Sequence, residues 1–442
     1  MAHQVDSGYA WFRLVVSLLL MTIGGAGMYV VVVVLPTVQA EFGVARAEAS
    51  LPYTLTMLGF GLGGIFMGRL ADRYGILVPS VLGAVALAAG FVAAAYSPNL
   101  LVFALIQGLV IGFMGSSSTF SPLLAETSFW FLRRRGIAVA IVAAGNYLGG
   151  AVWPPIVQAF VEDHGWRSTY IGIGIFCLVT MVPLALLLRA PRPQATALPV
   201  EPGEAAKAVE QAAQRPGTAG AGTASARASA LQHSTERPLG FAPGALLTLL
   251  CIAGVACCVA MSMPQVHIVA YCADLGFGPA RGAEMLSLML ACGIVSRLVS
   301  GMICDRVGGL RTLLLGSILQ TIALLLFLPF DSMVSLYVIS ALFGLFQGGI
   351  VPSYAIIIRE YFSPALAGMR VGMVITSTMV GMALGGWLSG AIFDMTGSYE
   401  AAFINGIGWN LLNVAIVVWL LKRASGAGLL TPIRPRQQPA LA

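Results

Sequence analysis

Charged residues are scarce in this sequence: Asp, Glu, Lys and Arg make up 10% of its 442 residues, whereas a soluble domain carries about 25%. Hydrophobic residues make up 58%. A water-soluble fold of this length needs a polar surface, which 24 basic and 18 acidic side chains cannot supply. The scarcity of charge therefore excludes a soluble globular protein.

Metal-ligand, disulfide and catalytic patterns are also lacking. The seven cysteines fall inside or at the ends of hydrophobic runs, without metal-ligand spacing. We find no zinc-protease motif, no Ser–His–Asp set and no phosphate-binding glycine loop. We therefore expect no metal, no cofactor and no enzymatic activity. The first hydrophobic run is longer than the core of a signal peptide and no clear cleavage pattern ends it, so we expect it to be retained.

Long hydrophobic runs are what the sequence has in abundance. Twelve of them can cross a hydrocarbon core of ~30 Å as helices of roughly 20 residues. Backbone groups in lipid must pair within their own segment, and the runs are too long for barrel strands of ~10 residues. The sequence predicts an all-α membrane protein with twelve spanning helices, near residues 11–36, 50–69, 76–96, 99–126, 136–161, 167–189, 243–272, 283–304, 311–329, 333–358, 366–393 and 401–421.

The basic residues predict the orientation, because cytoplasmic loops hold the excess of Lys and Arg. With both termini inside, Arg46, Arg167 and Arg281 fall outside, Arg297 falls within a span, and the other 20 of the 24 fall on the cytoplasmic side. We therefore predict a multi-pass protein of the inner (cytoplasmic) membrane with both termini in the cytoplasm. The net charge of +6 reflects this topology, so nucleic acid is not an expected partner.

Residues 190–240 interrupt the hydrophobic pattern and divide the chain. Ala, Pro, Gly, Gln, Glu and Arg dominate there, and such a segment cannot bury enough surface to fold. We predict a disordered cytoplasmic linker at 190–240 between two six-helix bundles, at 1–189 and 241–423, with a cytoplasmic tail at 424–442.

The two halves repeat each other at a nearly constant offset. The segment GRLADRYG at 68–75 is followed 233 residues later by GMICDRVG at 301–308. Trp130-Phe131 and Tyr361-Phe362 are 231 residues apart, and the segments at 164–167 and 396–399 are 232 apart. Three landmarks that agree within two residues indicate two pseudo-symmetric halves.

These residues resemble the signature of the major facilitator superfamily, Gly-x-x-x-Asp-Arg/Lys-x-Gly after helices 2 and 8. The resemblance covers nearly the whole chain, apart from the linker and tails. It implies two bundles that rock about a central site and open it alternately to each side. Charges at the helix ends can hold one conformation closed, so we expect a gating role for Asp72, Arg73, Asp305 and Arg306. The alternative is that these four only shape loops and set orientation.

Arg297 is the residue that most strongly indicates a function. It lies ~20 Å from one end of its span and ~12 Å from the other, where a charge costs at least ~2.5–3.5 kcal/mol unless it faces a cavity or a partner. Of the 18 acids, all but Glu126 fall in loops, in tails or at span ends. Glu126 lies at the inner end of the fourth span, and we expect it to pair with Arg133–Arg135. A buried ion pair is the alternative for Arg297, but we expect a bound anion, because a guanidinium matches a carboxylate bidentately.

One fixed positive charge favours a monoanion, and moving it inward against a membrane potential requires a co-transported cation, most simply a proton. His267, the only histidine within a span, could carry that proton or bond the substrate, or could simply pack. Tyr354 and Asn146 are polar residues of spans that we assign to the cavity; the alternative is hydrogen bonding between helices. The expected partners are thus a small organic anion, a proton and the lipid bilayer, with the chain acting as a monomer.

Two further motifs, DSGYAW at 6–11 and WFLRRRGIA at 130–138 followed by Ala144-Gly145, resemble the signatures of the monocarboxylate transporters and their oxalate:formate antiporter relatives. This resemblance implies that Arg297 binds the substrate carboxylate. The sequence departs from the animal members at Tyr29, where they have a proton-linked lysine, and at Gly293, where they have an aspartate. We assign five residues to the substrate site, namely Arg297, His267, Tyr354, Asn146 and Tyr29. Helix 11 lacks the lysine of the oxalate exchangers, which argues against dicarboxylate exchange.

The sequence is also compatible with two other functions. The segment GNYLGG at 145–150 resembles the glycine-rich antiporter motif, with Asn146 in place of its proline, which would fit a proton-coupled efflux antiporter for drugs or metabolites. Cationic-drug exporters usually place a carboxylate in the membrane, however, and this chain places an arginine there. A non-transporting membrane sensor with the same fold is the alternative of another class.

Overall fold

The computed structural model describes residues 5–131, 135–190, 238–362 and 367–426. Within these residues twelve helical spans are long and apolar enough to cross a membrane, and no strand is present. Each span lies close to its expected range, which confirms the predicted all-α membrane fold. The spans are Gly8–Val33, Arg46–Tyr74, Leu77–Ala95, Leu100–Trp130, Gly136–His164, Trp166–Leu187, Pro243–Asp274, Pro279–Val307, Gly309–Leu326, Met333–Tyr361, Met369–Thr396 and Tyr399–Ser425.

The first six spans form the N-terminal bundle. Its helices are α1 (Gly8–Gly24), α2 (Ala26–Val33), α3 (Leu35–Phe42), α4 (Arg46–Tyr74), α5 (Leu77–Ala95), α6 (Leu100–Leu105), α7 (Ser121–Trp130), α8 (Arg135–His164) and α9 (Trp166–Leu187). A π-helix at Ile106–Gly115 and a 3₁₀ turn at Ser116–Thr119 join α6 to α7.

The last six spans form the C-terminal bundle. Its helices are α12 (Pro243–Asp274), α13 (Pro279–Val307), α14 (Gly309–Leu326), α15 (Met333–Gln347), α16 (Ile350–Tyr361), α17 (Ala367–Thr396) and α18 (Tyr399–Gly426), with a 3₁₀ turn at Pro238–Gly240 before α12. Most of the predicted linker and tail, residues 191–237 and 427–442, lies outside the described residues.

Helix ends follow the repeat seen in the sequence. Helices α4 and α13 end at Tyr74 and Val307, 233 residues apart. The glycine that follows each has a positive φ, 79° at Gly75 and 86° at Gly308, with ψ near 170° in both. An L side chain rarely adopts that backbone conformation, so the same turn leads into α5 and into α14.

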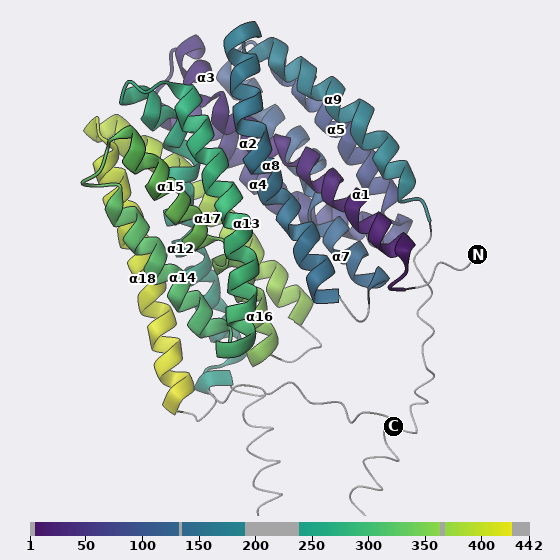
Figure 1. The fold of residues 1–442 in the computed structure, drawn as a ribbon, viewed down its shortest axis with the longest axis vertical. Helices are drawn as coiled ribbons and strands as arrows, with labels where there is room; N and C mark the ends of the chain where they lie inside the picture. The colour runs from purple at the N-terminus through teal and green to yellow at the C-terminus, as the bar shows by residue number, and fades with distance from the viewer. Residues whose placement is uncertain (1–4, 132–134, 191–237, 363–366, 427–442) are drawn as a thin grey trace, which may run out of the picture.

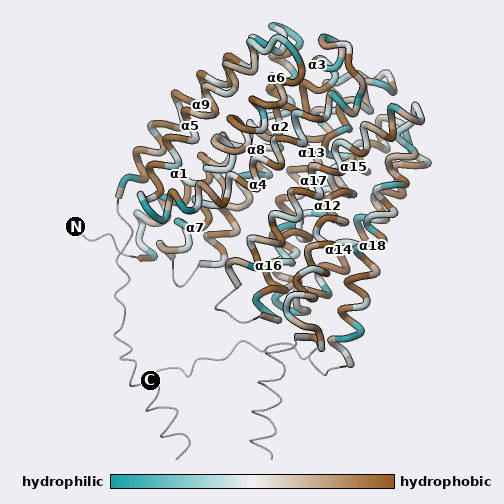
Figure 2. Tube along the Cα trace, turned by 180° about the vertical axis from the view of Figure 1, so that it is seen from behind, coloured by the Kyte–Doolittle hydropathy of each residue, from teal (hydrophilic) through white to brown (hydrophobic). Residues whose placement is uncertain are grey.

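The two bundles lie side by side, the N-terminal one in purple and blue and the C-terminal one in green and yellow (Figure 1). Helix α4 packs against α17, and α8 packs against α13, so these four helices form most of the interface between the bundles, and α12 adds contacts to α2 and α3. We call the end at which α1 begins and α18 ends the terminus side, and the end that carries α3 the opposite side. Hydrophobic residues dominate the length of the helices, and hydrophilic ones gather near their ends (Figure 2).

Helix starts have local causes in the sequence. The Ser7 hydroxyl accepts a hydrogen bond from the Ala10 amide and so caps α1. Proline occupies the first turn of α12 and of α13, at Pro243 and Pro279, where its missing N–H is not needed. These caps fix where the spans begin and therefore at which depth their side chains lie.

Candidate functional site

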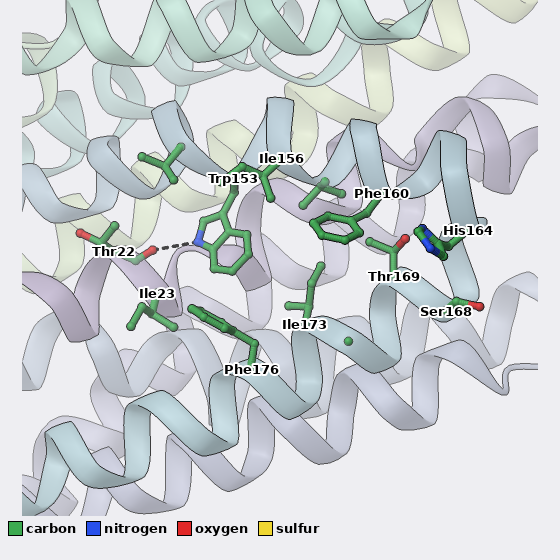
Figure 3. Close-up of a pocket in the computed structure, with 13 residues that line it drawn as sticks. Thr22, Ile23, Trp153, Ile156, Phe160, His164, Ser168, Thr169, Ile173 and Phe176 are labelled. Atoms are coloured by element: carbon green, nitrogen blue, oxygen red, sulfur yellow. Dashed lines mark hydrogen bonds between the residues drawn. The ribbon is translucent and has the colours of Figure 1, made fainter.

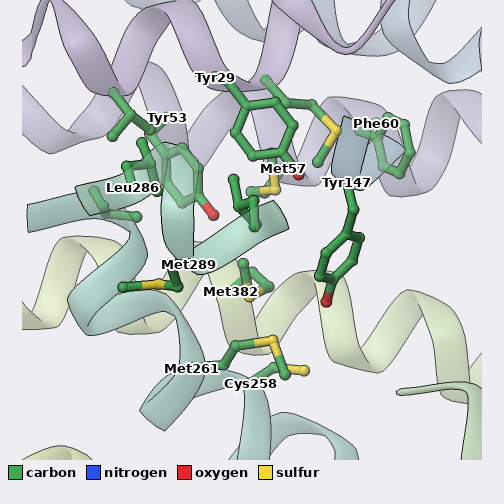
Figure 4. Packing of buried hydrophobic residues seen from close by; sticks show 14 of the residues in the cluster. Tyr29, Tyr53, Met57, Phe60, Tyr147, Cys258, Met261, Leu286, Met289 and Met382 are labelled. Carbon is green, nitrogen blue, oxygen red and sulfur yellow. The ribbon is translucent and has the colours of Figure 1, made fainter. Parts of the chain in front are cut away.

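A cavity of about 100 Å³ lies between the two bundles and takes its lining from both. Among the described residues that line it, Arg297 alone carries a charge. Figure 4 shows side chains of the two bundles meeting in this region. Most of the lining consists of aromatic residues and methionines, namely Tyr29, Tyr53, Phe60, Phe120, Tyr147, Met28, Met57, Met261, Met379 and Met382.

Arg297 extends from α13 to the N-terminal bundle. Its Nη1 donates a hydrogen bond to the carbonyl oxygen of Ala143 at 3.1 Å, and its Nε donates to that of Gly348 at 3.4 Å. Its guanidinium carbon stands 4.2 Å from the centroid of the Tyr147 ring, within range of a cation–π interaction. The ion pairs of the described residues do not include Arg297, so no carboxylate of that part of the chain neutralises it.

Tyr29 and Asn146 line the same cavity as Arg297. Helix α8 carries Asn146, and the Tyr29 ring packs against Gly150 of α8, where an added Cβ would lie 2.7 Å from the Tyr29 Cζ. The structure thus brings together three of the five residues that the sequence assigned to the substrate.

His267 and Tyr354, the other two, are not among the lining residues. His267 is fully buried, with its Nε2 2.8 Å from the carbonyl oxygen of Gly386 and its Nδ1 3.2 Å from the Tyr399 hydroxyl. Tyr354 is also fully buried and donates to Asn413 at 3.1 Å inside the C-terminal bundle. Both make the hydrogen bonds between helices that were the alternative for polar residues in spans.

The four expected gating residues lie at the terminus side. Asp72, Arg73, Asp305 and Arg306 are exposed there, at the ends of α4 and α13. Arg73 stacks on the ring of its neighbour Tyr74, with the guanidinium carbon 5.2 Å from the ring centroid.

Glu126 has a partner that the sequence did not suggest. It pairs with Arg13 of α1, at 2.9 Å between Nη2 and Oε1, inside the N-terminal bundle. The expected partners Arg133 and Arg134 lie outside the described residues, and the side chain of Arg135 is not described.

A charged network joins the bundles at the opposite side. The Asp394 carboxylate of α17 accepts hydrogen bonds from the amides of Arg46 and Ala47, at 2.8 and 2.7 Å. It therefore sits at the N-terminus of α4, where the helix dipole favours an anion. The Arg46 guanidinium donates to the Tyr399 hydroxyl at 2.6 Å and pairs with Asp274 at 3.2 Å.

Sequence reasoning missed this network. Its signal was present, because Arg46, Asp274 and Asp394 all lie at span ends on the same predicted side of the membrane. Single-sequence patterns do not reveal which of these ends touch across the two halves.

A second hollow, of about 610 Å³, lies within the N-terminal bundle between α1, α8 and α9 (Figure 3). The Trp153 side chain lines this hollow and donates a hydrogen bond through Nε1 to the carbonyl oxygen of Thr22 at 3.0 Å. Its walls are mainly apolar, with Phe160 and Phe176 on either side of it. Arg297 is not part of this lining and the hollow does not touch the C-terminal bundle, so it is separate from the central cavity.

Comparison with known proteins places this arrangement in a family. The model of the Major Facilitator Superfamily matches residues 17–333 and 248–442. Monocarboxylate transporter 13 of Rattus norvegicus is 27% identical over 358 residues, which cover 80% of this chain and 75% of that protein. The MFS-type transporter YcxA of Bacillus subtilis is 26% identical over 373 residues, which cover 83% of each.

Solved structures agree in fold. The nucleoside transporter NupG superposes with a TM-score of 0.69 at 13% identity, covering 93% of this chain and all (100%) of that one. The peptide transporter POT in complex with sulfate gives 0.66 at 15% identity, covering 98% of both. Solved structures at this identity show the fold, and the family model, which covers most of the chain, shows a multi-pass membrane transporter and not an enzyme. The chain belongs to the Major Facilitator Superfamily.

Proposed function

We propose that this protein carries a small organic anion with one carboxylate and an apolar body. The observation that supports this is Arg297, the one charged residue of the described cavity lining, which has no carboxylate partner in the described chain. A charge at this depth is costly when it is alone. A bound carboxylate offsets that cost, because a guanidinium can donate two parallel hydrogen bonds to it.

The charge of the substrate follows from the count of cations. One guanidinium and one carboxylate make a neutral occupied site, whereas a dicarboxylate would bring a second negative charge into a cavity without a second cation among its described lining residues. Burying that extra charge without a partner is strongly unfavourable. We therefore propose a monocarboxylate.

The body of the substrate would lie against methionines and aromatic rings. Asn146 and Gln265 are the amide side chains of the lining, beside three tyrosines. A hydroxyl-rich body would leave polar groups unpaired against the methionine wall, at about 1–3 kcal/mol for each. Apolar and aromatic bodies suit this wall better, because methionine sulfur contacts rings favourably.

Alternating access is the proposed mechanism. The Arg46–Asp274 pair and the Asp394 cap tie the bundles together at the opposite side, whereas Asp72, Arg73, Asp305 and Arg306 are exposed at the terminus side. This contrast supports a conformation closed at the opposite side. Rocking of the bundles would break the network there and bring the terminus-side charges together.

The coupling ion and the membrane follow from charge. Inward movement of a monoanion against ~100 mV costs about 2.3 kcal/mol, so we propose symport with a proton. His267 is our candidate carrier of that proton, because its Nδ1 lies 3.2 Å from the Tyr399 hydroxyl, which also accepts a hydrogen bond from Arg46 in the opposite-side network. The basic excess supports an inner membrane with the terminus side in the cytoplasm, and we propose a monomer as the working unit.

Thermal stabilisation of the purified protein tests the proposal. Benzoate, lactate and succinate are compared on the wild type, on Arg297→Gln and on Arg359→Gln, a control that removes an equal charge from an exposed position. We expect benzoate to stabilise the wild type and Arg359→Gln most, succinate least, and Arg297→Gln to lose the effect. Equal stabilisation of Arg297→Gln would contradict an anion site at Arg297 and favour the efflux antiporter or the sensor.

A further inference from the structure

Two groups on one face of α8 hold Arg297. Ala143 and Tyr147 are four residues apart, so they lie one above the other on the same side of the helix. The Ala143 carbonyl oxygen accepts from Nη1 at 3.1 Å, and the Tyr147 ring centroid lies 4.2 Å from the guanidinium carbon. Arg297 belongs to α13, so these contacts dock the cation of one bundle on the other.

Gly293 provides the space for the Tyr147 ring. It lies on α13 one turn before Arg297, and a Cβ at this position would overlap Cδ1 and Cε1 of the ring. The ring therefore lies directly against the backbone of α13, next to the guanidinium of the following turn. Tyr147 is only 6% exposed, so packing from both bundles fixes the orientation of the ring.

The ring attracts the guanidinium without neutralising it. A π face offers a partial negative potential but no charge and no strong acceptor. A guanidinium has five N–H donors, and in the described chain Arg297 donates only from Nη1 and Nε. The donors of Nη2 and the full positive charge therefore stay available at the cavity.

We propose that Tyr147 is the positioning residue of Arg297 and that Gly293 gives its ring the place to act. The ring takes the role that a carboxylate would have in a structural ion pair, and it leaves the charge for the substrate. This inference rests on the proposed function for the identity of the ligand. The positioning of Arg297 by Tyr147 can be tested without any ligand.

The ligand-free protein is labelled with phenylglyoxal, and the labelling rate of Arg297 is followed by mass spectrometry of its peptides. A faster rate means that the guanidinium is held less firmly. Tyr147→Phe keeps the ring, Tyr147→Leu removes it, and Gly293→Ala displaces it. We expect wild-type labelling of Arg297 in Tyr147→Phe and labelling about two- to fivefold faster in the other two. Arg359, which is exposed and remote in sequence, is the internal control and should label equally in all four proteins.

Benzoate is the probe for binding in the same proteins. We expect its affinity to fall about fivefold in Tyr147→Leu and to stay near the wild-type value in Tyr147→Phe. Wild-type labelling of Arg297 in Tyr147→Leu would overturn the inference, and so would a Phe variant that behaves like the Leu variant. If benzoate binds none of the proteins while the labelling differs as expected, the proposed ligand class fails and the positioning role stands.

Discussion

Two arginines, Arg13 of the N-terminal bundle and Arg297 of the C-terminal bundle, make similar contacts to an aromatic ring and to a backbone carbonyl oxygen but differ in their acidic partner. Each guanidinium carbon stands 4.2 Å from an aromatic centroid, that of Trp130 and that of Tyr147. Each also donates to a backbone carbonyl oxygen, at 3.0 Å for Arg13 and at 3.1 Å for Arg297. Only Arg13 is paired with a carboxylate within the described chain, that of Glu126.

This difference separates a structural cation from one that a ligand can use. The side chains of Arg13 and Glu126 are both 3% exposed, and Trp130 donates a further hydrogen bond to the same carboxylate at 3.0 Å. Arg297 is half-buried and borders a cavity. The repeat does not impose the pair on both halves, because the counterpart of Glu126 at an offset of 231 residues is Ile357, a buried apolar side chain.

The largest effect on stability is expected from Glu126→Gln. This variant leaves Arg13, like Arg297, without that carboxylate partner, but Arg13 does not gain a cavity. The guanidinium would be left as an uncompensated buried charge, so we expect a loss of about 3 kcal/mol in the free energy of unfolding. Denaturant unfolding in mixed micelles measures it. The double variant Arg13→Met/Glu126→Gln removes both charges and should recover most of the loss; an equally unstable double variant would contradict the ion-pair explanation.

An intermediate effect is expected when Arg297 is made to resemble Arg13. Gly293→Asp supplies a carboxylate one turn away, and Tyr147→Ala in the same chain removes the ring that would overlap it. We expect the new ion pair to weaken benzoate binding about tenfold beyond Tyr147→Ala alone, because the charge-assisted hydrogen bonds of Arg297 are already used. Titration calorimetry of both variants gives the comparison. Equal affinities would mean that the charge of Arg297 does not bind the anion.

The sequence predicted the fold and one side of the site. Twelve hydrophobic runs and a 233-residue offset are properties of the chain itself, and the cost of a deep charge singled out Arg297. Tyr147 was not predicted, because its role depends on Gly293 of the other bundle, and single-sequence patterns do not reveal contacts across the interface. His267 and Tyr354 were assigned to the substrate site, but the structure buries both between helices, outside the cavity lining. Their spans are apolar on all sides, so periodicity does not indicate which face points inward.

The smallest effect is expected on the folding stability of Arg297→Gln. Arg13→Gln would break the buried pair between Arg13 and Glu126 and should cost several kcal/mol. Arg297→Gln leaves no described carboxylate unpaired and removes a cation–π contact of about 0.5–1 kcal/mol, while it also removes the cost of holding a charge at this depth. We therefore expect its unfolding free energy, measured in the same micelles without ligand, to stay within about 1 kcal/mol of the wild type. A loss as large as that of Arg13→Gln would mean that Arg297 is a structural cation too, and that its availability to a substrate is not what distinguishes the two arginines.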